Sequence, residues 1–324
     1  MADAPRVTLL VIAYKMAATI DQAMRSAFAQ THPCEIIVSD DSSGDDTVAI
    51  AQAIADDYAG PHRVRVRSTA RNVGLCAHLN ELANEASGDI LVFLAGDDVA
   101  YPERVEKLAA AFRDNPAAQL VGSAVDEIDA DGNAIRRGVR ALPPRVEQKW
   151  LLTCGKMTTV LGASMAVKRS LIADLPPLQG AIEDNMLTLR AALVGECLCL
   201  PEALLGYRRH AANFAKRVFV RDARDYDSFE RRNRKVIALY RDIAADQRRC
   251  IAARPDLPEQ RRALGTKLAE MYELEADMRE AILDRSRWQW LPLLVRGLRH
   301  PGLRRRSIER TLKLVVPRRI RLRR

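Results

Sequence analysis

Short apolar runs alternate with helical patterns through the first half of the chain, and this rhythm constrains the fold more than any other feature. We expect strands at residues 7–13, 34–39, 64–68 and 90–94. Strands that alternate with helical segments predict a parallel sheet covered by helices, the α/β fold class. Open sheets of this kind bind ligands outside the carboxyl ends of their strands, so the residues after each run are candidate site residues.

Two consecutive carboxylates, Asp97 and Asp98, follow the fourth run. The run Ile90–Leu94 is apolar throughout, which is typical of a central strand buried on both faces. Hard cations such as Mg²⁺ and Mn²⁺ take oxygen ligands, and one or two carboxylates commonly hold them beside a substrate's phosphates. The pair therefore predicts a divalent cation site. The alternative is a solvated turn before a helix that begins near Pro102.

The first run is followed by Tyr14 and by a predicted helix. We expect this helix to begin near Thr19, with Gln22 in the position of a capping-box partner.

The second run opens into the acidic turn 40–47. Asp45 or Asp46 is expected to cap a helix over residues 48–58, since Asp is a favoured N-cap residue. Asp40 and Asp41 come earlier, at the strand end, where a carboxylate could accept a hydrogen bond from a base or a ribose.

The order of these segments resembles the nucleotide-binding half of family 2 glycosyltransferases. The matching segments are 7–26, 30–33, 39–47, 71–74 with Asn80, and 88–98, and the likeness covers residues 5–215. The resemblance implies a GT-A fold, a Rossmann-like α/β domain that binds a nucleotide-diphospho-sugar. It departs from the family at Ala95, where many members carry Asp. Either cation binding rests on Asp97 and Asp98, or it is weaker.

The resemblance also implies roles for single residues. Tyr14 and the backbone near Ala13 would face the base, and Asp41 would bond its ring N–H. Asp97 would approach the ribose, and Asp98 would bind the metal, Mn²⁺ or Mg²⁺. Arg71, in the segment 71–74, would contact the nucleotide-sugar.

A second acidic pair, Glu183 and Asp184, opens a predicted helix further along the chain. An inverting sugar transfer needs a carboxylate to take the proton of the acceptor hydroxyl. The resemblance assigns this base to the pair, and we expect Asp184 to be the base and Glu183 to orient the acceptor. The alternative is helix capping with a favourable charge on the helix dipole, worth about 1 kcal/mol.

A third motif, Leu205–His210, follows a predicted strand at residues 197–200. It resembles the Tyr-Arg-x-His sequence that closes many such domains. Arg208 would contact the diphosphate through its planar donor fork, and His210 would complete the metal shell. A His beside two Arg residues is otherwise a surface residue.

Length and charge divide the 324 residues into three parts. We expect a GT-A domain at 1–216, a helical extension at 217–286 and a basic tail at 287–324. Residues 285–324 carry a net charge of +13 against +9 for the whole chain, which leaves −4 for residues 1–284. Two apolar helical faces, separated near Pro255 and Pro258, would pack on the catalytic domain or on a partner in a homodimer.

The tail segment 288–295 pairs Trp and Leu with flanking arginines. It is too short to span a bilayer, but it could lie at an anionic membrane surface. The alternatives are a solvated basic tail and a nucleic-acid contact, and clustered Trp favours lipid.

Several sequence motifs that would indicate other classes of protein are absent. There is no Gly-x-Gly-x-x-Gly, no Walker loop and no Gln-x-x-Arg-Trp motif, so a nicotinamide enzyme, an ATPase and a processive polysaccharide synthase are disfavoured. The six cysteines show no zinc spacing and no signal peptide precedes the first run, so we expect a cytoplasmic protein, peripheral on the inner face of the plasma membrane.

Together these features predict an enzyme that moves one sugar, with inversion, from a nucleotide diphosphate-sugar to a hydroxyl acceptor. The acceptor would be a glycan or a lipid-linked precursor in polysaccharide, O-antigen or lipopolysaccharide assembly. Two alternatives are a sugar nucleotidyltransferase, whose early Gly-rich Arg/Lys loop is absent here, and a non-catalytic scaffold, with which Ala95 is compatible.

Overall fold

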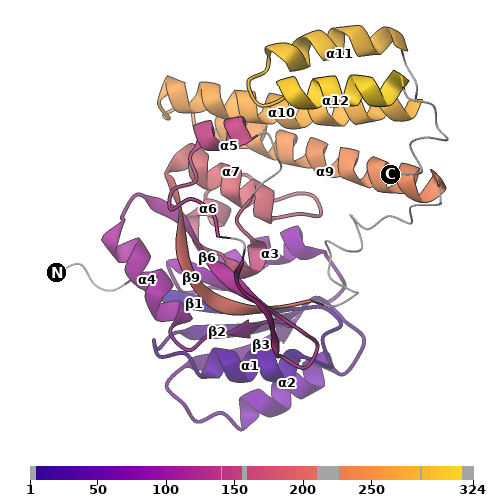
Figure 1. Cartoon of the computed structure of the whole chain (residues 1–324). Helices are drawn as coiled ribbons and strands as arrows, with labels where there is room; N and C mark the ends of the chain where they lie inside the picture. The colour runs from indigo at the N-terminus through magenta and orange to yellow at the C-terminus, as the bar shows by residue number, and fades with distance from the viewer. Residues whose placement is uncertain (1–4, 140, 155–158, 210–225, 285–286, 316–324) are drawn as a thin grey trace. The chain divides into compact units, whose positions relative to one another are not determined.

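The computed structural model describes residues 5–139, 141–154, 159–209, 226–284 and 287–315 (Figure 1). The chain forms two compact units, each with its own packing. The first comprises residues 1–147 and 159–210, and the second comprises 148–158 and 211–324.

The first unit is an α/β domain built on one mixed sheet. Its strands are β1 (Val7–Ala13), β2 (Glu35–Asp40), β3 (Arg63–Ser68), β4 (Ile90–Ala95), β5 (Val99–Ala100), β6 (Ala118–Ile128), β7 (Ala134–Val139), β8 (Ala166–Lys168) and β9 (Glu196–Arg208). Its helices are α1 (Ile20–Phe28), α2 (Thr47–Asp56), α3 (Leu75–Glu85), α4 (Arg104–Asp114), α6 (Ser170–Ala173) and α7 (Asp184–Val194), with a short 3₁₀ helix, η1 (Gly162–Ser164).

The strand order is β3-β2-β1-β4-β8-β6-β9-β5, with β7 paired to β6. The first four strands are parallel, as their alternation with helices predicted. The three-residue strand β8 then pairs antiparallel with both β4 and β6. The α/β fold predicted from the sequence is confirmed.

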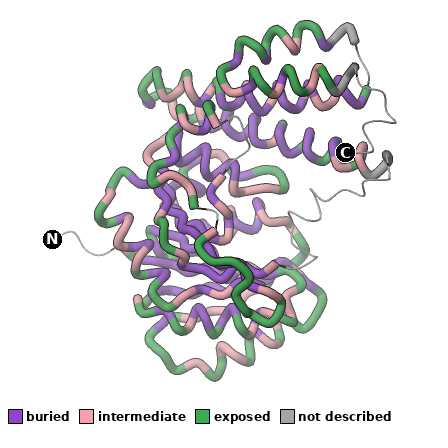
Figure 2. The backbone as a smooth tube through the Cα atoms, in the orientation of Figure 1, coloured by how far each residue is buried: buried purple, intermediate pink, exposed green. Residues whose placement is uncertain are grey.

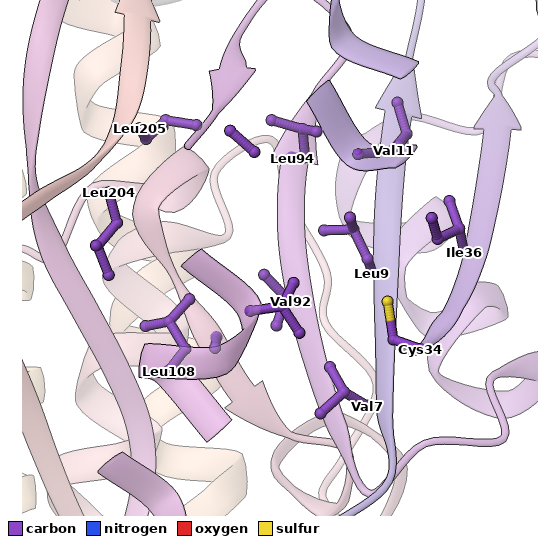
Figure 3. Close-up of a cluster of buried hydrophobic side chains, with 14 of the residues drawn as sticks. Val7, Leu9, Val11, Cys34, Ile36, Val92, Leu94, Leu108, Leu204 and Leu205 are labelled. Carbon is purple, nitrogen blue, oxygen red and sulfur yellow. The ribbon is translucent and has the colours of Figure 1, made fainter. Parts of the chain in front are cut away.

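Strands β1, β2 and β4 are buried on both faces because helices cover both sides of the sheet, whereas β3, at the edge, is only partly buried (Figure 1). Neighbouring residues of β1 such as Leu9 and Leu10 point to opposite faces, and both are fully buried. Figure 3 shows the cluster on one of these faces, where alternate residues of β1, β2 and β4 meet Leu108 of α4. Helix α1 adds Ile20, Met24 and Ala27 to this cluster, and their helical spacing makes its apolar stripe.

Two predicted elements differ in detail. The predicted helix 48–58 is α2, Thr47–Asp56. At its start the Asp45 carboxylate, rather than that of Asp46, accepts a hydrogen bond from the Thr47 N–H at 3.1 Å. The predicted strand 197–200 is the beginning of the longer β9, which continues through Arg208.

The predicted capping box of α1 is wrong. Thr19 precedes the helix, but its side chain caps no helical N–H. Its hydroxyl donates instead to the Gly96 carbonyl at 2.8 Å, and Gln22 accepts a bond from Arg208. Thr19 therefore holds the turn that follows β4. Gln22 holds Arg208, whose Nε donates to the Asp97 carbonyl of that turn.

The second unit is helical. It consists of α5 (Gln148–Cys154), α9 (Tyr226–Ala253), α10 (Glu259–Asp284), α11 (Arg287–Arg299) and α12 (Arg304–Val315). The predicted break near Pro255 and Pro258 separates α9 from α10. The apolar faces of these two helices pack on each other, with the Tyr240 and Tyr272 rings edge to face, rather than being left for a partner.

The boundaries of this unit were not evident from the sequence. The structure joins 148–158 to the helical unit, where the Gln148 side chain donates to the Arg261 carbonyl. It also places the described part of the predicted tail, α11 and α12, in the same unit as α9 and α10. None of the helices that the structure describes is both long and apolar enough to cross a membrane.

Candidate active site

The predicted site residues that follow β1, β2 and β4 meet at one edge of the sheet. The strand register pairs Ala13 with Asp40 and Ile12 with Ala95, so the three strands end side by side. Tyr14, Asp41 and the turn Gly96–Asp98 follow directly from these positions.

The turn after β4 buries two carboxylates next to each other. Asp97 is 8% exposed and Asp98 is 1% exposed. One oxygen of Asp98, Oδ1, accepts the Arg208 N–H at 2.8 Å. The other, Oδ2, is buried and has no hydrogen-bond partner within the described part of the chain. Burial, and then the charge of Asp97, raise the pKa of Asp98 well above its usual value.

A buried carboxylate oxygen without a partner costs free energy unless a ligand satisfies it. A divalent cation would do so, because hard cations bind carboxylate oxygen. Asp98, with Asp97 beside it, therefore fits the predicted cation site. In the described segments no group of three or more His, Cys, Asp or Glu side chains could hold a metal. The remaining ligands would come from the diphosphate and water. His210, the other predicted ligand, lies outside the described residues.

The buried Arg208 braces this turn. Its Nε donates to the Asp97 carbonyl at 2.7 Å, and its Nη2 donates to Gln22 Oε1 at 2.6 Å. Its Nη1 donates to the Asp129 carbonyl at 2.9 Å, near the start of the β6–β7 turn. The guanidinium predicted to meet the diphosphate is thus engaged with protein oxygens, and here it positions the acidic turn.

Arg104 is a site residue that sequence reasoning missed. It is fully buried, and its Nη2 donates to the carbonyls of Phe93 in β4 (2.6 Å) and Ala163 in η1 (2.8 Å). Its Nε and Nη1 have no partner among the described residues. Burial lowers the pKa of Arg104 to about 10, and the charge of Asp98 opposes that shift. In the sequence, Arg104 looked like an ordinary polar residue of a helix.

Asp41 shapes the neighbouring loop. Its Oδ1 accepts the Val73 N–H at 2.9 Å and the Thr69 hydroxyl at 3.0 Å, and its Oδ2 accepts the Gly74 N–H at 2.8 Å. Gly74, with φ of +81°, then turns the chain into α3. Asp41 thereby fixes the loop that carries the exposed Arg71.

Tyr14 is the exposed aromatic residue of this edge. Its side chain is 39% exposed, and the Lys15 ammonium lies 5.3 Å from the centre of its ring. Lys15 has a positive φ, and its N–H donates to Ser43 Oγ at 2.7 Å. The aromatic ring is therefore held on a fixed turn beside the acidic turn after β2.

The second acidic pair lies at the start of α7. Asp184 Oδ1 accepts the Asn185 N–H at 2.7 Å, but the N-cap residue of α7 is Glu183 and no side chain caps this helix, so the expected alternative of capping by Asp184 is wrong. Its carbonyl accepts the hydroxyls of Thr159 and Thr188, each at 2.8 Å. Burial, and then the charge of Asp184, raise the pKa of Glu183 to about 8.

Gly162 in η1 makes room for Glu183, because a Cβ at this position would overlap with Glu183 Oε1. The neighbouring carbonyl of Ala163 accepts the bond from Arg104, which also holds β4. Arg104 and η1 therefore link β4, the strand that precedes the turn with Asp97 and Asp98, to the surroundings of Glu183.

The strand order and the acidic turn at the sheet edge define a domain of the GT-A class. The chain belongs to glycosyl transferase family 2, whose sequence model matches residues 8–175.

Two curated relatives illustrate this membership. EpsE of Bacillus subtilis, provisionally named a glycosyltransferase, is 31% identical over 144 residues, which cover 44% of this chain and 50% of EpsE. The succinoglycan biosynthesis protein ExoO of Rhizobium meliloti is 34% identical over 145 residues, covering 44% of this chain and 40% of ExoO. The chain thus spans about half or less of the length of these relatives.

Two solved structures share the fold. Residues 1–349 of TarS from S. aureus, in complex with UDP, superpose with a TM-score of 0.56 at 19% identity, covering 88% of this chain and 75% of that one. The mannosyltransferase PcManGT of Pyrobaculum calidifontis, in complex with GDP-Man and Mn²⁺, gives a TM-score of 0.51 at 15% identity, covering 97% and 88%.

Proposed function

We propose that the protein transfers one sugar, with inversion, from a nucleotide diphosphate-sugar to a hydroxyl acceptor in the assembly of a polysaccharide, O-antigen or lipopolysaccharide. The observation that carries the proposal is the buried Oδ2 of Asp98, which has no hydrogen-bond partner among the described residues, at the sheet edge that also holds Tyr14 and Asp41. Family membership supports sugar transfer, and the relative ExoO supports a polysaccharide product.

The donor would bind at this edge. Tyr14 and the backbone near Ala13 would face the base, Asp41 would bond its ring N–H, and Asp97 would approach the ribose. Arg71, exposed on the loop that Asp41 fixes, would contact the nucleotide-sugar. Asp98 would hold the Mn²⁺ or Mg²⁺, which supplies charge neutralisation for the leaving diphosphate.

Asp184 would act as the general base. Its carboxylate takes the proton of the acceptor hydroxyl while that oxygen bonds to the anomeric carbon from the side opposite the diphosphate. The bond from the anomeric carbon to the diphosphate breaks, and the diphosphate leaves with the electron pair. The single displacement inverts the anomeric centre.

The raised pKa of Glu183 supports different roles for Glu183 and Asp184. With a pKa of about 8, Glu183 is protonated at pH 7, so its carboxyl group can donate a hydrogen bond to the acceptor. The single negative charge of the pair then lies on Asp184, at the N-terminus of α7, where a helix favours it.

Nucleotide binding tests the donor site. We expect one of UDP, GDP, dTDP or CDP to raise the melting temperature with Mn²⁺ and to lose most of this effect in EDTA, because a ligand bound by the native state stabilises it. Asp98→Asn should abolish the metal-dependent part. An exposed acid serves as control, and Asp114→Asn should behave as the wild type.

Product analysis tests the reaction. Release of a nucleoside diphosphate supports sugar transfer, whereas release of pyrophosphate would assign a nucleotidyltransferase. Asp184→Asn should abolish transfer, by about 10²-fold or more, and keep nucleotide affinity. Wild-type turnover in this variant would remove Asp184 from the base role, and no nucleotide binding at all would favour a non-catalytic scaffold.

A further inference from the structure

The hairpin of α11 and α12 exposes apolar side chains that its own packing does not use. Leu291, Val295 and Leu298, spaced by four and three residues, form one stripe of α11 and are 66%, 39% and 39% exposed. Ile308 and Leu312, one turn apart on α12, are 53% and 61% exposed. Figure 2 shows exposed stretches along both helices. Isolated exposed apolar residues are ordinary, but two helical stripes on one hairpin need an explanation.

The opposite side of the hairpin is already packed. Trp290 is buried with Met278 and Ile282 of α10, and its indole N–H donates to Thr311 Oγ1 of α12 at 3.0 Å. Leu303, at the start of α12, is also fully buried. The sequence pattern predicts that the segment 288–295 presents Trp to lipid, and for Trp290, which is buried, this prediction is wrong. Among the side chains of α11 that the structure describes, the exposed large apolar ones are those of Leu291, Val295 and Leu298.

Arginines of the hairpin separate into an inner and an outer set. Arg306 and Arg310 bond the fully buried Glu275 of α10 at 3.5 and 3.1 Å. The outer set, Arg296, Arg299, Arg304 and Arg305, is exposed. One acid, Glu309, lies on the two described helices, and it bonds Arg305. The outer surface therefore combines apolar stripes with an excess of positive charge.

We infer that the outer surface of the α11–α12 hairpin docks on the surface of an anionic lipid bilayer. Helices of 13 and 12 residues are too short to span a membrane, and they suit a position in the plane of the interface. Leucine, valine and isoleucine enter the acyl boundary, and the outer arginines reach the lipid phosphates. A second copy of the chain fits the apolar stripes, but it would bring the outer arginines of two hairpins together.

Vesicle flotation of the full chain tests the apolar contribution. Phosphatidylcholine vesicles containing phosphatidylglycerol should retain the wild type. The triple variant Leu291→Ser, Val295→Ser and Leu298→Ser should lose about tenfold or more in partition coefficient, since each substitution removes insertable apolar surface. Ile135→Ser is a matched control, because Ile135 is 53% exposed on β7 of the first unit. We expect it to partition as the wild type.

A second pair of variants tests the charge. Arg296→Gln with Arg299→Gln should lower partition by about tenfold at low salt, and the difference should shrink as salt is raised. Arg25→Gln with Arg113→Gln removes two exposed arginines of the first unit and should have no effect. Equal retention by vesicles with and without phosphatidylglycerol would overturn the inference.

The mass of the protein in solution distinguishes lipid docking from dimerisation through the apolar stripes. A monomer in the absence of vesicles, with binding lost in both hairpin variants, supports lipid docking. A dimer that the triple variant dissociates, together with no vesicle retention, would assign the stripes to a second copy. Vesicle binding does not require a donor or turnover, so its outcome is independent of the proposed sugar transfer.

Discussion

At the scale of single residues, the candidate site depends on carboxylates held in two different electrostatic settings. Asp98 is buried, and one of its oxygens has no partner in the described part of the chain, a setting suited to a cation. Glu183 is half-buried beside a second acid, a setting that keeps its proton. Side chains of similar chemistry therefore have different proposed roles because their surroundings differ.

The protonated state of Glu183 predicts a pH dependence of turnover. Because burial and Asp184 raise the pKa of Glu183 to about 8, we expect kcat/KM to fall as pH rises through this value, where Glu183 ionises and no longer donates a hydrogen bond. Glu183→Gln keeps a donor and cannot titrate, so its profile should lack the alkaline fall. Glu103→Gln, at an exposed acid, should keep it. The same fall in Glu183→Gln would assign the ionisation to another group.

At the scale of elements, buried polar side chains join strands and helices that are distant in the sequence. Arg104 of α4 bonds carbonyls of β4 and η1, and Glu35 of β2 bonds residues of β1, β3 and the turn before β4. Each such link fixes the relative position of elements that periodicity alone leaves unspecified.

Arg104 should affect the site through η1. Arg104→Met keeps an unbranched buried chain but removes both carbonyl bonds, so β4 and η1 lose the link through the guanidinium. We expect the nucleotide-dependent rise in melting temperature to shrink and kcat to fall about tenfold or more, because small displacements at a site are costly. Arg113→Met, on the exposed face of α4, is the control. Unchanged nucleotide binding and turnover would limit Arg104 to a structural role.

Glu35 should make the first unit acid-sensitive. Burial raises the pKa of Glu35, but hydrogen bonds from Thr8, Ser87 and Arg63 outweigh it and lower the pKa to about 2. The contribution to stability is therefore complete above the unfolded pKa of about 4.5 and is lost as pH falls toward 2.

Urea unfolding at pH 7 and pH 3 measures this effect. Glu35→Gln should lose about 1–2 kcal/mol of unfolding free energy at pH 7, and its remaining stability should fall less on acidification. Asp114→Asn, at an exposed acid, should retain the wild-type acid sensitivity. A Glu35→Gln variant that loses stability on acidification as steeply as the wild type would contradict the assignment.

At the scale of the whole molecule, each of the two units is stabilised from within by a different kind of interaction. The α/β unit rests on a sheet buried between helices, whereas the helical unit encloses an acid, Glu275, among Arg279, Arg306 and Arg310. This cluster ties α10 to α12 through one buried carboxylate.

Removing that carboxylate should weaken the helical unit selectively. Glu275→Gln leaves three arginines without their buried acid, and we expect a loss of about 3 kcal/mol. Hydrogen exchange should rise in α10 and α12, while the amides of β1 and β4 stay protected. Glu280→Gln, which pairs with the exposed Arg241, is the control. A uniform rise in exchange through both units would show that they unfold as one.

The sequence by itself determined the parallel strands, their helices and the edge at which Asp41, Asp97 and Asp98 meet. These follow from local apolar periodicity and from the rule that parallel strands end together. The resemblance to family 2 glycosyltransferases followed from the same segments in the same order, and the family is confirmed.

Only the tertiary structure decided which side chains brace the site. Gln22 and Arg208 are 186 residues apart, and Arg104 meets Ala163 across 59 residues, so no local pattern could pair them. The membership of 148–158 in the helical unit and the inward turn of Trp290 are likewise long-range results. A local sequence fixes which face of an element is apolar, but the element that covers this face depends on how the whole chain packs.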